Sequence, residues 1–274
     1  MSDFFFEYLL LRCILKKSFI HSILLMVVNN KITKQLSNDF IHFTYDEVFA
    51  AYRDCLRNKS NSLNAINFEK DDINALVDLC YDINKGTYEI GSSIAFVVKI
   101  PVYREVFAAD FVDRIVHHLI IAELRPYFDA AFITESFSCR EGKGVMYGLE
   151  TIQRKIKECT DNYTKDAWIL KMDVKSFFMS INKHLLSQRV DEFIVEKYPD
   201  NRKKECLRWL CKLVIMNQPE KNCKKRGDLN AWEKLPKGKS LFDVGEMFGL
   251  PIGNLTSQIF ANFFLNPLDK YIKD

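Results

Sequence analysis

Residues 168–182 read WILKMDVKSFFMSIN, and the interpretation of the rest of the chain starts from this stretch. Large apolar side chains alternate with their neighbours from Trp168 to Met172, and a period of two predicts a buried strand. The strand would present Asp173 at its C-terminal end, followed by the aromatic pair Phe177 and Phe178. A carboxylate and the next backbone carbonyl are oxygen ligands that Mg²⁺ accepts. The stretch therefore predicts a cation site beside a flat ligand. The alternative is an N-cap aspartate between a core strand and a core helix, with both phenylalanines packed.

Length and composition set broad limits on the fold and on the partners. The chain has 274 residues, 48% of them hydrophobic and 27% charged, enough for one large domain or two small ones. A formal net charge of +3 permits a nucleic-acid partner without requiring one, because local clustering matters more than the total.

The eight cysteines are scattered, without a CxxC pair or a cysteine–histidine spacing typical of metal ligands. This pattern predicts free thiols in a reducing, cytoplasmic compartment and argues against a zinc site.

Residues 1–39 are interpreted as an N-terminal extension of unknown role. Two apolar runs, 4–11 and 19–28, are each too short for the roughly 20 residues of a membrane-spanning helix. No small-residue cleavage site follows them. We therefore expect no membrane partner, with an interfacial helix as the alternative.

Regular patterns begin at residue 40. Thr44 would cap a first helix, Gly86 would stop a second and Pro126 would end a third. We expect helices over residues 46–58, 68–85, 112–127 and 149–159, and extended runs over 88–100 and 104–111.

A long helical region is expected after Asn182. Its part over 197–226 is rich in lysine and arginine, which suits either a solvated helix face or a surface that follows phosphates. Residues 245–274 form a glycine-bracketed loop that opens a helix. The side chains expected to face the core from this helix are Ile259, Phe260, Phe263 and Phe264.

Four motifs follow one another along the chain: REVFAADFVDRIVHH (104–118), SFSCREGKG (136–144), WILKMDVKSFFMSI (168–181) and GLPIGNLTSQ (249–258). Together they resemble the reverse transcriptases, specifically those of diversity-generating retroelements, from about residue 40 to the C-terminus. The last motif is the most specific. Most reverse transcriptases carry a glutamine–glycine pair there and end the motif in serine–proline. This chain has Ile252-Gly253 and Ser257-Gln258, like the diversity-generating type.

The resemblance implies an α/β (α+β) fold, namely the fingers and partial palm of a right-handed polymerase. Fingers would span 40–160. A partial palm would span 161–274, including a basic helical insertion over about 183–244. Helices would pack on a small antiparallel sheet carrying Asp173.

The resemblance also implies nucleotidyl transfer by two Mg²⁺ ions. Asp173 would be the first metal carboxylate and the catalytic residue, and Val174 would offer its carbonyl oxygen. Phe178 stands where the family places the ring that excludes a ribose 2′-hydroxyl, so deoxynucleotides would be selected. Phe177 is expected in the core.

Two arginines are implied to contact the incoming nucleotide. Arg104 matches the residue that grips the triphosphate, an anion that a guanidinium fork suits. Arg140 matches a second basic residue near nucleotide or template, and Lys143 would assist it. The alternative for each is a surface ion pair worth at most about 1 kcal/mol.

The helix after the first motif carries further polar side chains with structural interpretations. Asp113 and Arg114 are expected to form a structural pair. His117 and His118 are expected to be packed or capped rather than catalytic.

Ile252, Gly253 and Gln258 are implied to form a nucleotide-binding loop beneath the nascent base pair. Ile252 cannot donate the hydrogen bond of the usual glutamine. We hypothesise that this change weakens control of the base pair, since the family copies template adenines with errors.

The chain also departs from the family pattern. The tyrosine–x–aspartate–aspartate motif, which supplies the remaining metal carboxylates, and the thumb do not occur within the 274 residues. One carboxylate cannot hold two divalent cations against their repulsion, so this polypeptide alone is expected to be inactive. Val102 stands where the family usually has lysine.

The predicted function is RNA-directed DNA synthesis, copying a template-repeat RNA into error-prone cDNA in a bacterial or phage retroelement. The implied partners are the RNA template, a DNA or RNA primer, deoxynucleoside triphosphates and a small basic helical accessory protein. The alternatives are a group II intron-like or other bacterial reverse transcriptase, a non-catalytic nucleic-acid-binding remnant, and a helical interaction domain.

Overall fold

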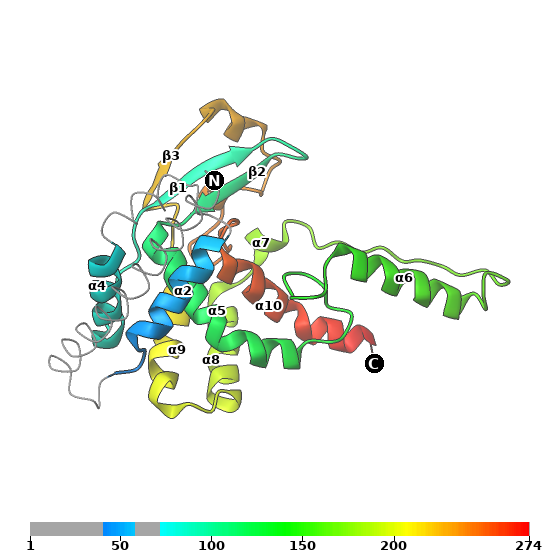
Figure 1. Ribbon diagram of the computed structural model, residues 1–274. Helices are drawn as coiled ribbons and strands as arrows, with labels where there is room; N and C mark the ends of the chain where they lie inside the picture. The colour runs from blue at the N-terminus through cyan, green and yellow to red at the C-terminus, as the bar shows by residue number, and fades with distance from the viewer. Residues whose placement is uncertain (1–40, 58–71, 274) are drawn as a thin grey trace, which may run out of the picture.

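A computed structural model describes residues 41–57 and 72–273, and the N-terminal extension lies outside this range. Helices form most of the body, and a small sheet lies at one end of it (Figure 1). The elements are α2 (Tyr45–Arg57), α4 (Asp72–Lys85), β1 (Ser93–Val98), β2 (Arg104–Ala108), α5 (Phe111–Ala131), α6 (Val145–Cys159), α7 (Phe177–Ser180), α8 (Lys183–Lys197), α9 (Asn201–Met216), β3 (Cys223–Lys225), η2 (Leu229–Lys234), η3 (Leu241–Asp243) and α10 (Leu255–Lys273).

The predicted cap at Thr44 and the predicted stop at Gly86 are confirmed, whereas the expected start of the second helix at residue 68 lies outside the described residues. The Glu47 N–H donates to Thr44 Oγ1 at 3.3 Å, and the Thr44 N–H donates to Glu47 Oε2 at 2.8 Å. This reciprocal capping box satisfies two backbone donors at the start of α2. Gly86 follows α4 with φ +70°, a conformation that favours glycine at a helix end.

Helix α5 is the centre of the body and contacts α2, α9 and α10. It continues through Pro126, so the expected end of the helix at that proline is wrong. Leu124 and Phe128 flank the proline and are fully buried. Burial of such side chains is worth about 1.5–3 kcal/mol each, which offsets the roughly 3 kcal/mol that an interior proline costs.

The apolar core is rich in aromatic rings where α5, α8 and α10 meet. Phe128 lies 4.7 Å from Phe263 and 5.2 Å from Phe193, measured between ring centroids. Ile259, Phe260 and Phe263 are buried, as predicted for the last helix, and Phe264 is half-buried and packs against the core. None of the helices described within 41–57 and 72–273 combines the length and apolar character needed to cross a bilayer.

The sheet has the strand order β2-β1-β3 and is mixed. Strands β1 and β2 are antiparallel, whereas β1 and β3 are parallel. The fold class, helices with a small sheet, is confirmed, but the sheet is not purely antiparallel. The expected helical region after Asn182 is confirmed by α8 and α9, and after residue 216 it is followed by β3 and the short 3-10 helices η2 and η3.

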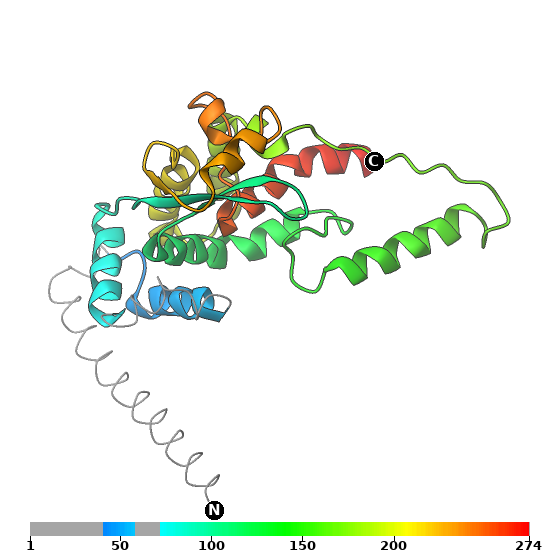
Figure 2. The same ribbon diagram turned by 90° about the horizontal axis from the view of Figure 1, so that it is seen from above.

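The stretch 168–174 is not a strand, and the prediction that it is buried is wrong. Trp168 is 98% exposed and Leu170 is 81% exposed. With α6, the stretch projects from the body, and it runs back beside that helix to α7 (Figures 1 and 2). A strand forms only when a second backbone pairs with it. No backbone within the described part of the chain pairs with this one. Asp173 therefore does not lie on the sheet.

Candidate functional site

The loop over residues 249–254, GLPIGN, is where the motifs identified in the sequence meet. Its first residues bond to the end of the third motif: the Gly249 N–H donates to the Ile181 carbonyl and the Leu250 N–H to the Phe178 carbonyl, both at 2.9 Å. Gly249 has φ +89°, and a Cβ there would lie 2.5 Å from Leu241 Cδ2. Only glycine fits this turn without displacing its neighbours.

The middle of the same loop bonds to the first motif. Phe107 on β2 donates its N–H to the Ile252 carbonyl at 2.8 Å. Gly253 has φ +120°, and a Cβ there would lie 2.7 Å from Val106 Cγ1. The Ala109 N–H donates to Asn254 Oδ1 at 3.3 Å. The loop is thereby attached to β2 and the residue after it by hydrogen bonds to Ile252 and Asn254, and Gly253 between them approaches β2 closely.

The second motif contacts the helix that the loop opens. Cys139 Sγ donates to Gln258 Oε1 at 3.2 Å, and Asn262 Nδ2 donates to the Ser138 carbonyl. The first and second motifs and the end of the third thus converge on the loop and on α10. Of the predicted nucleotide-binding residues, Ile252, Gly253, Gln258 and Phe178 belong to this assembly.

Arg140 holds the loop that follows α5. Its Nε and Nη2 bond to the side chain and carbonyl of Asp129, and its Nη1 bonds to the carbonyls of Ile133 and Ser136 at 2.8 and 3.1 Å. These contacts occupy all three guanidinium nitrogens. Lys143 likewise donates to the Thr134 carbonyl at 2.6 Å. The nucleotide contacts expected of Arg140 and Lys143 remain predictions, and Arg140 would have to exchange partners to make one.

Asp173 and Val174 lie exposed on the segment that returns from α6. Arg104 is exposed at the start of β2. No hydrogen bond or ion pair within the described residues joins Asp173 to Arg104 or Arg140. The predicted convergence of these three side chains on one pocket therefore remains a prediction.

The residues described here do not by themselves fit a pair of magnesium ions. Asp173 and the Val174 carbonyl offer oxygen ligands of the right kind. However, within 41–57 and 72–273 no group of three or more histidine, cysteine, aspartate or glutamate side chains is placed to hold a metal. Asp173 would thus be one ligand of a site that needs further carboxylates.

Asp113 and Arg114 both have structural partners, but they do not pair with each other as expected. Asp113 Oδ1 accepts from the Tyr88 hydroxyl at 2.6 Å and from the Gly91 N–H at 3.1 Å. Burial raises the pKa of Asp113 above its usual value. Arg114 donates Nε–H to the Ala109 carbonyl at 2.9 Å. The Asp113 side chain thus fixes the segment before β1, and the Arg114 side chain fixes the residue that follows β2.

The two histidines that follow are packed and paired, in agreement with their structural interpretation. His117 is buried, with Nδ1 3.4 Å from Thr256 Oγ1 at the start of α10. Burial, together with the charges of His118 and Arg114, lowers the pKa of His117 to about 3. His118 Nδ1 lies 2.7 Å from Asp54 Oδ2 on α2.

Glu105 organises this region, and sequence reasoning missed it. Its buried carboxylate accepts from Trp232 Nε1 at 2.7 Å, from Ser240 Oγ at 2.8 Å and from the Leu241 N–H at 2.7 Å. Glu105 lies two residues from the buried Phe107 and so shares its face of β2. A charged residue at a buried position of a predicted strand could have identified it.

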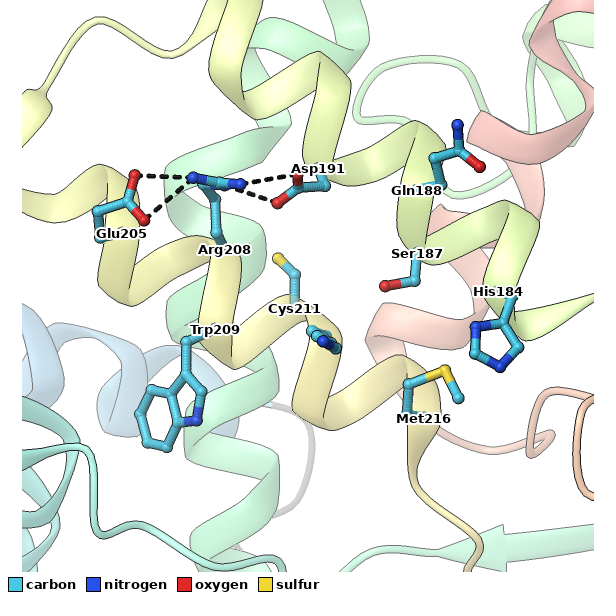
Figure 3. A pocket seen from close by; sticks show the side chains of 10 residues that line it. His184, Ser187, Gln188, Asp191, Glu205, Arg208, Trp209, Cys211 and Met216 are labelled. Atoms are coloured by element: carbon cyan, nitrogen blue, oxygen red, sulfur yellow. Dashed lines mark hydrogen bonds and ion pairs between the residues drawn. The ribbon is translucent and has the colours of Figure 1, made fainter.

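A hollow of about 530 Å³ lies between α8 and α9 (Figure 3). Arg208 bridges Asp191 and Glu205 on its wall, with Nε 2.6 Å from Asp191 Oδ1. The residues that line it include none from the four motifs. This hollow is therefore separate from the assembly around loop 249–254.

Comparison with known proteins shows the family of the chain. Residues 101–274 match the family model described as "Reverse transcriptase (RNA-dependent DNA polymerase)", which is more than half of the chain. The chain is also similar to Protein YkfC of Escherichia coli (strain K12), with 23% identity over 167 residues. That alignment covers 59% of this chain and 35% of YkfC. The chain thus spans about a third of the length of this relative.

Proposed function

Because the chain belongs to the reverse transcriptase (RNA-dependent DNA polymerase) family, we propose that it forms the fingers and part of the palm of an RNA-directed DNA polymerase. The fingers would comprise residues 40–160 and the partial palm residues 161–274. The observation that carries the proposal is the attachment of loop 249–254 to both Phe107 and Phe178. This attachment joins the motif expected to bind triphosphate, the motif that holds Asp173 and the motif expected to lie under the base pair.

Each predicted side chain has a role in this proposal. Arg104 is exposed and, among the described residues, has no acidic partner, so it is free to bind a triphosphate. Asp173 would contribute one carboxylate to the two magnesium ions of the complete enzyme. Phe178 packs beside Phe177, with 5.8 Å between ring centroids, and its ring would exclude a ribose 2′-hydroxyl.

The specific type proposed is the diversity-generating retroelement enzyme, which copies a template-repeat RNA into error-prone cDNA with a small basic accessory protein. Support comes from Ile252-Gly253 and Ser257-Gln258. The Ile252 side chain packs against the cluster of Ala95, Phe107, Met179 and Leu241. The position of the usual glutamine is thus occupied by a side chain that has no hydrogen-bond donor. Replacing Ile252 with glutamine is expected to lower misincorporation opposite template adenines. An unchanged error rate would refute this link.

Discrimination between deoxynucleotides and ribonucleotides tests the proposed function. The full-length gene product would be supplied with an RNA template, a DNA primer and either nucleotide type. We expect incorporation of deoxynucleotides, and Phe178→Ala should reduce their preference in kcat/KM by about tenfold or more, because the smaller side chain admits the 2′-hydroxyl. Phe177→Ala is the matched control and should keep the preference.

Two outcomes of this experiment would count against the proposal. An absence of incorporation by the unmodified protein would favour a non-catalytic nucleic-acid-binding remnant. Incorporation with an unchanged preference in Phe178→Ala would remove Phe178 from the nucleotide site.

A further inference from the structure

The basic run over 197–226 and the residues that follow it differ in how their cations are used. In the α9 part, Lys203 is buried with Glu47 and Glu123, and Arg208 is paired with two acids. These cations serve the helical body. After β3, the chain continues from the end of this run into residues 226–239, which we name the basic segment.

The basic segment is anchored firmly, although its surface is exposed. At its start, the Arg226 N–H donates to the Ala95 carbonyl of β1 at 2.8 Å. In its middle and just beyond its end, Trp232, Ser240 and Leu241 all donate to the buried carboxylate of Glu105. The segment therefore has a defined position over the sheet, and a ligand would not have to order it.

The groups that anchor the basic segment are not its cationic side chains, and these side chains remain accessible. Arg226, Lys234, Lys237 and Lys239 are exposed, and none of them has an ion-pair partner among the residues that the structure describes. Of the two acids in the segment, Asp228 is neutralised by Lys99 at 2.9 Å. The segment thus presents four unpaired cations against one remaining acid, Glu233.

The basic segment also reaches the third motif. A Cβ built on Gly238 would lie 3.9 Å from Ser176 Oγ, so the backbone between Lys237 and Lys239 lies against the turn that precedes α7. Ser176 follows Asp173 by three residues. A polyanion lying along the segment would therefore be led toward the loop that carries this carboxylate.

We infer that the basic segment binds the sugar–phosphate backbone of the nucleic acid that the proposed polymerase copies or extends. The identity of this ligand rests on the proposed function, whereas the polyanion chemistry rests on the exposed cations. A row of cations without base-reading geometry binds phosphates regardless of sequence and releases counterions as it does so. Lys203 and Arg208 of α9, which are paired with acids of the body, are excluded from this contact.

The salt dependence of RNA binding tests the inference. Fluorescence anisotropy would measure the Kd of the full chain for a labelled single-stranded RNA of mixed sequence at a series of salt concentrations. The test variant carries Arg226→Gln, Lys234→Gln and Lys237→Gln. The matched control carries Arg202→Gln, Lys204→Gln and Lys212→Gln on α9, which removes the same number of lysines and arginines.

For single strands the logarithm of the binding constant changes by about 0.7 per phosphate contact with the logarithm of salt. The test variant should therefore bind more weakly, with a slope reduced by about 2, while the control keeps the slope of the unmodified chain. Should the triple variant fail to fold by circular dichroism, Lys237→Gln alone should reduce the slope by about 0.7.

An absence of RNA binding by the unmodified chain, or equal slopes in the test variant and the unmodified chain, would overturn the inference. Equally strong competition by polyglutamate of matched charge would also overturn it, in favour of an acidic protein partner. Primer extension is a separate readout. RNA binding that depends on the basic segment without extension would retain the inference and refute the proposed polymerase.

Discussion

Phe107 on β2 donates its backbone N–H to the carbonyl of Ile252 at 2.8 Å, joining two motifs that lie about half the chain apart. β1 pairs with the other edge of β2, so loop 249–254 attaches along the edge that β1 leaves open. A backbone bond of this kind depends on the conformation of the loop rather than on a particular side chain. The loop conformation, in turn, depends on Gly253.

Replacing Gly253 with alanine should therefore detach the loop. The residue has φ +120°, and the new Cβ would lie 2.7 Å from Val106 Cγ1 and 3.0 Å from the Phe107 carbonyl. We expect the free energy of unfolding to fall by about 1–3 kcal/mol, measured by urea denaturation. Gly245→Ala is the control, since a Cβ there meets nothing within 4 Å and should change stability little. Equal stabilities of the two variants would contradict this view of the loop.

Lys203 is expected to be a major contributor to stability. Its ammonium donates to Glu47 of α2 and to Glu123 of α5, the latter at 2.9 Å, and so ties α9 to both helices. Although burial acts to raise the pKa of Glu47, the hydrogen bonds from Lys203 and Thr44 hold that pKa below its usual value.

Lys203→Met should thus lower the free energy of unfolding by about 3 kcal/mol, because two partly buried carboxylates lose their cation. Lys204→Met, on the neighbouring position of the same helix, should change it by less than about 0.5 kcal/mol. Calorimetric melting of both variants makes the comparison. A loss in Lys203→Met no larger than that in Lys204→Met would mean that the buried contacts add nothing.

Stability should depend on pH through His117. Burial lowers its pKa to about 3 in the folded protein, whereas the pKa of a histidine in an unfolded chain is about 6.5. The unfolded chain therefore binds the proton more readily between these values. Stability is full above about pH 6.5 and is lost as the pH falls toward 3.

His117→Gln should flatten this dependence by up to about 1.4 kcal/mol per pH unit between about pH 6 and 4, measured by urea unfolding at several pH values. His184→Gln alters an exposed histidine of α8 and should keep the slope of the unmodified protein. An undiminished slope in His117→Gln would assign the acid sensitivity to other groups.

Glutamine, although close in shape to glutamate, should not replace Glu105 without a loss of stability. The carboxylate accepts three hydrogen bonds, whereas the glutamine of Glu105→Gln offers one acceptor oxygen and turns an amide N–H₂ toward donors. We expect a loss of about 1–3 kcal/mol in unfolding free energy and an altered Trp232 fluorescence. Glu233→Gln, at an exposed position of the basic segment, is the control. Unaltered fluorescence and stability in Glu105→Gln would show that the segment is held by other contacts.

The sequence predicted best what depends on neighbouring residues. The cap at Thr44 and the stop at Gly86 involve groups within one helical turn, so they could be predicted directly, whereas the partner of Thr44, Glu47, came from the structure. The apolar face of α10 follows equally from helical spacing. The continuation of α5 through Pro126 could not be predicted, because it depends on rings from α8 and α10 that pack on Phe128.

The candidate site was predicted less completely than the helices, because its contacts join parts of the chain that are distant in sequence. The family motifs singled out the loop residues, but their contacts with β2 and α7 could not be predicted because they join distant parts of the chain. The strand predicted over residues 168–172 does not form. Alternating apolar residues predict that one face of a strand is buried, but they do not show whether a second backbone is present to pair with it. The bonds of Arg140 depend on the fold of the loop after α5, and those of Glu105 depend on a segment more than a hundred residues away.

RNA-templated primer extension by the full-length gene product tests the central claim most directly, with Asp173→Asn compared against Asp166→Asn. Both carboxylates are exposed on the segment that returns from α6, so general effects on folding or charge should be alike. The account predicts magnesium-dependent extension by the unmodified protein and by Asp166→Asn, and a loss of at least about a thousandfold in Asp173→Asn. Extension by Asp173→Asn at the rate of Asp166→Asn would contradict it.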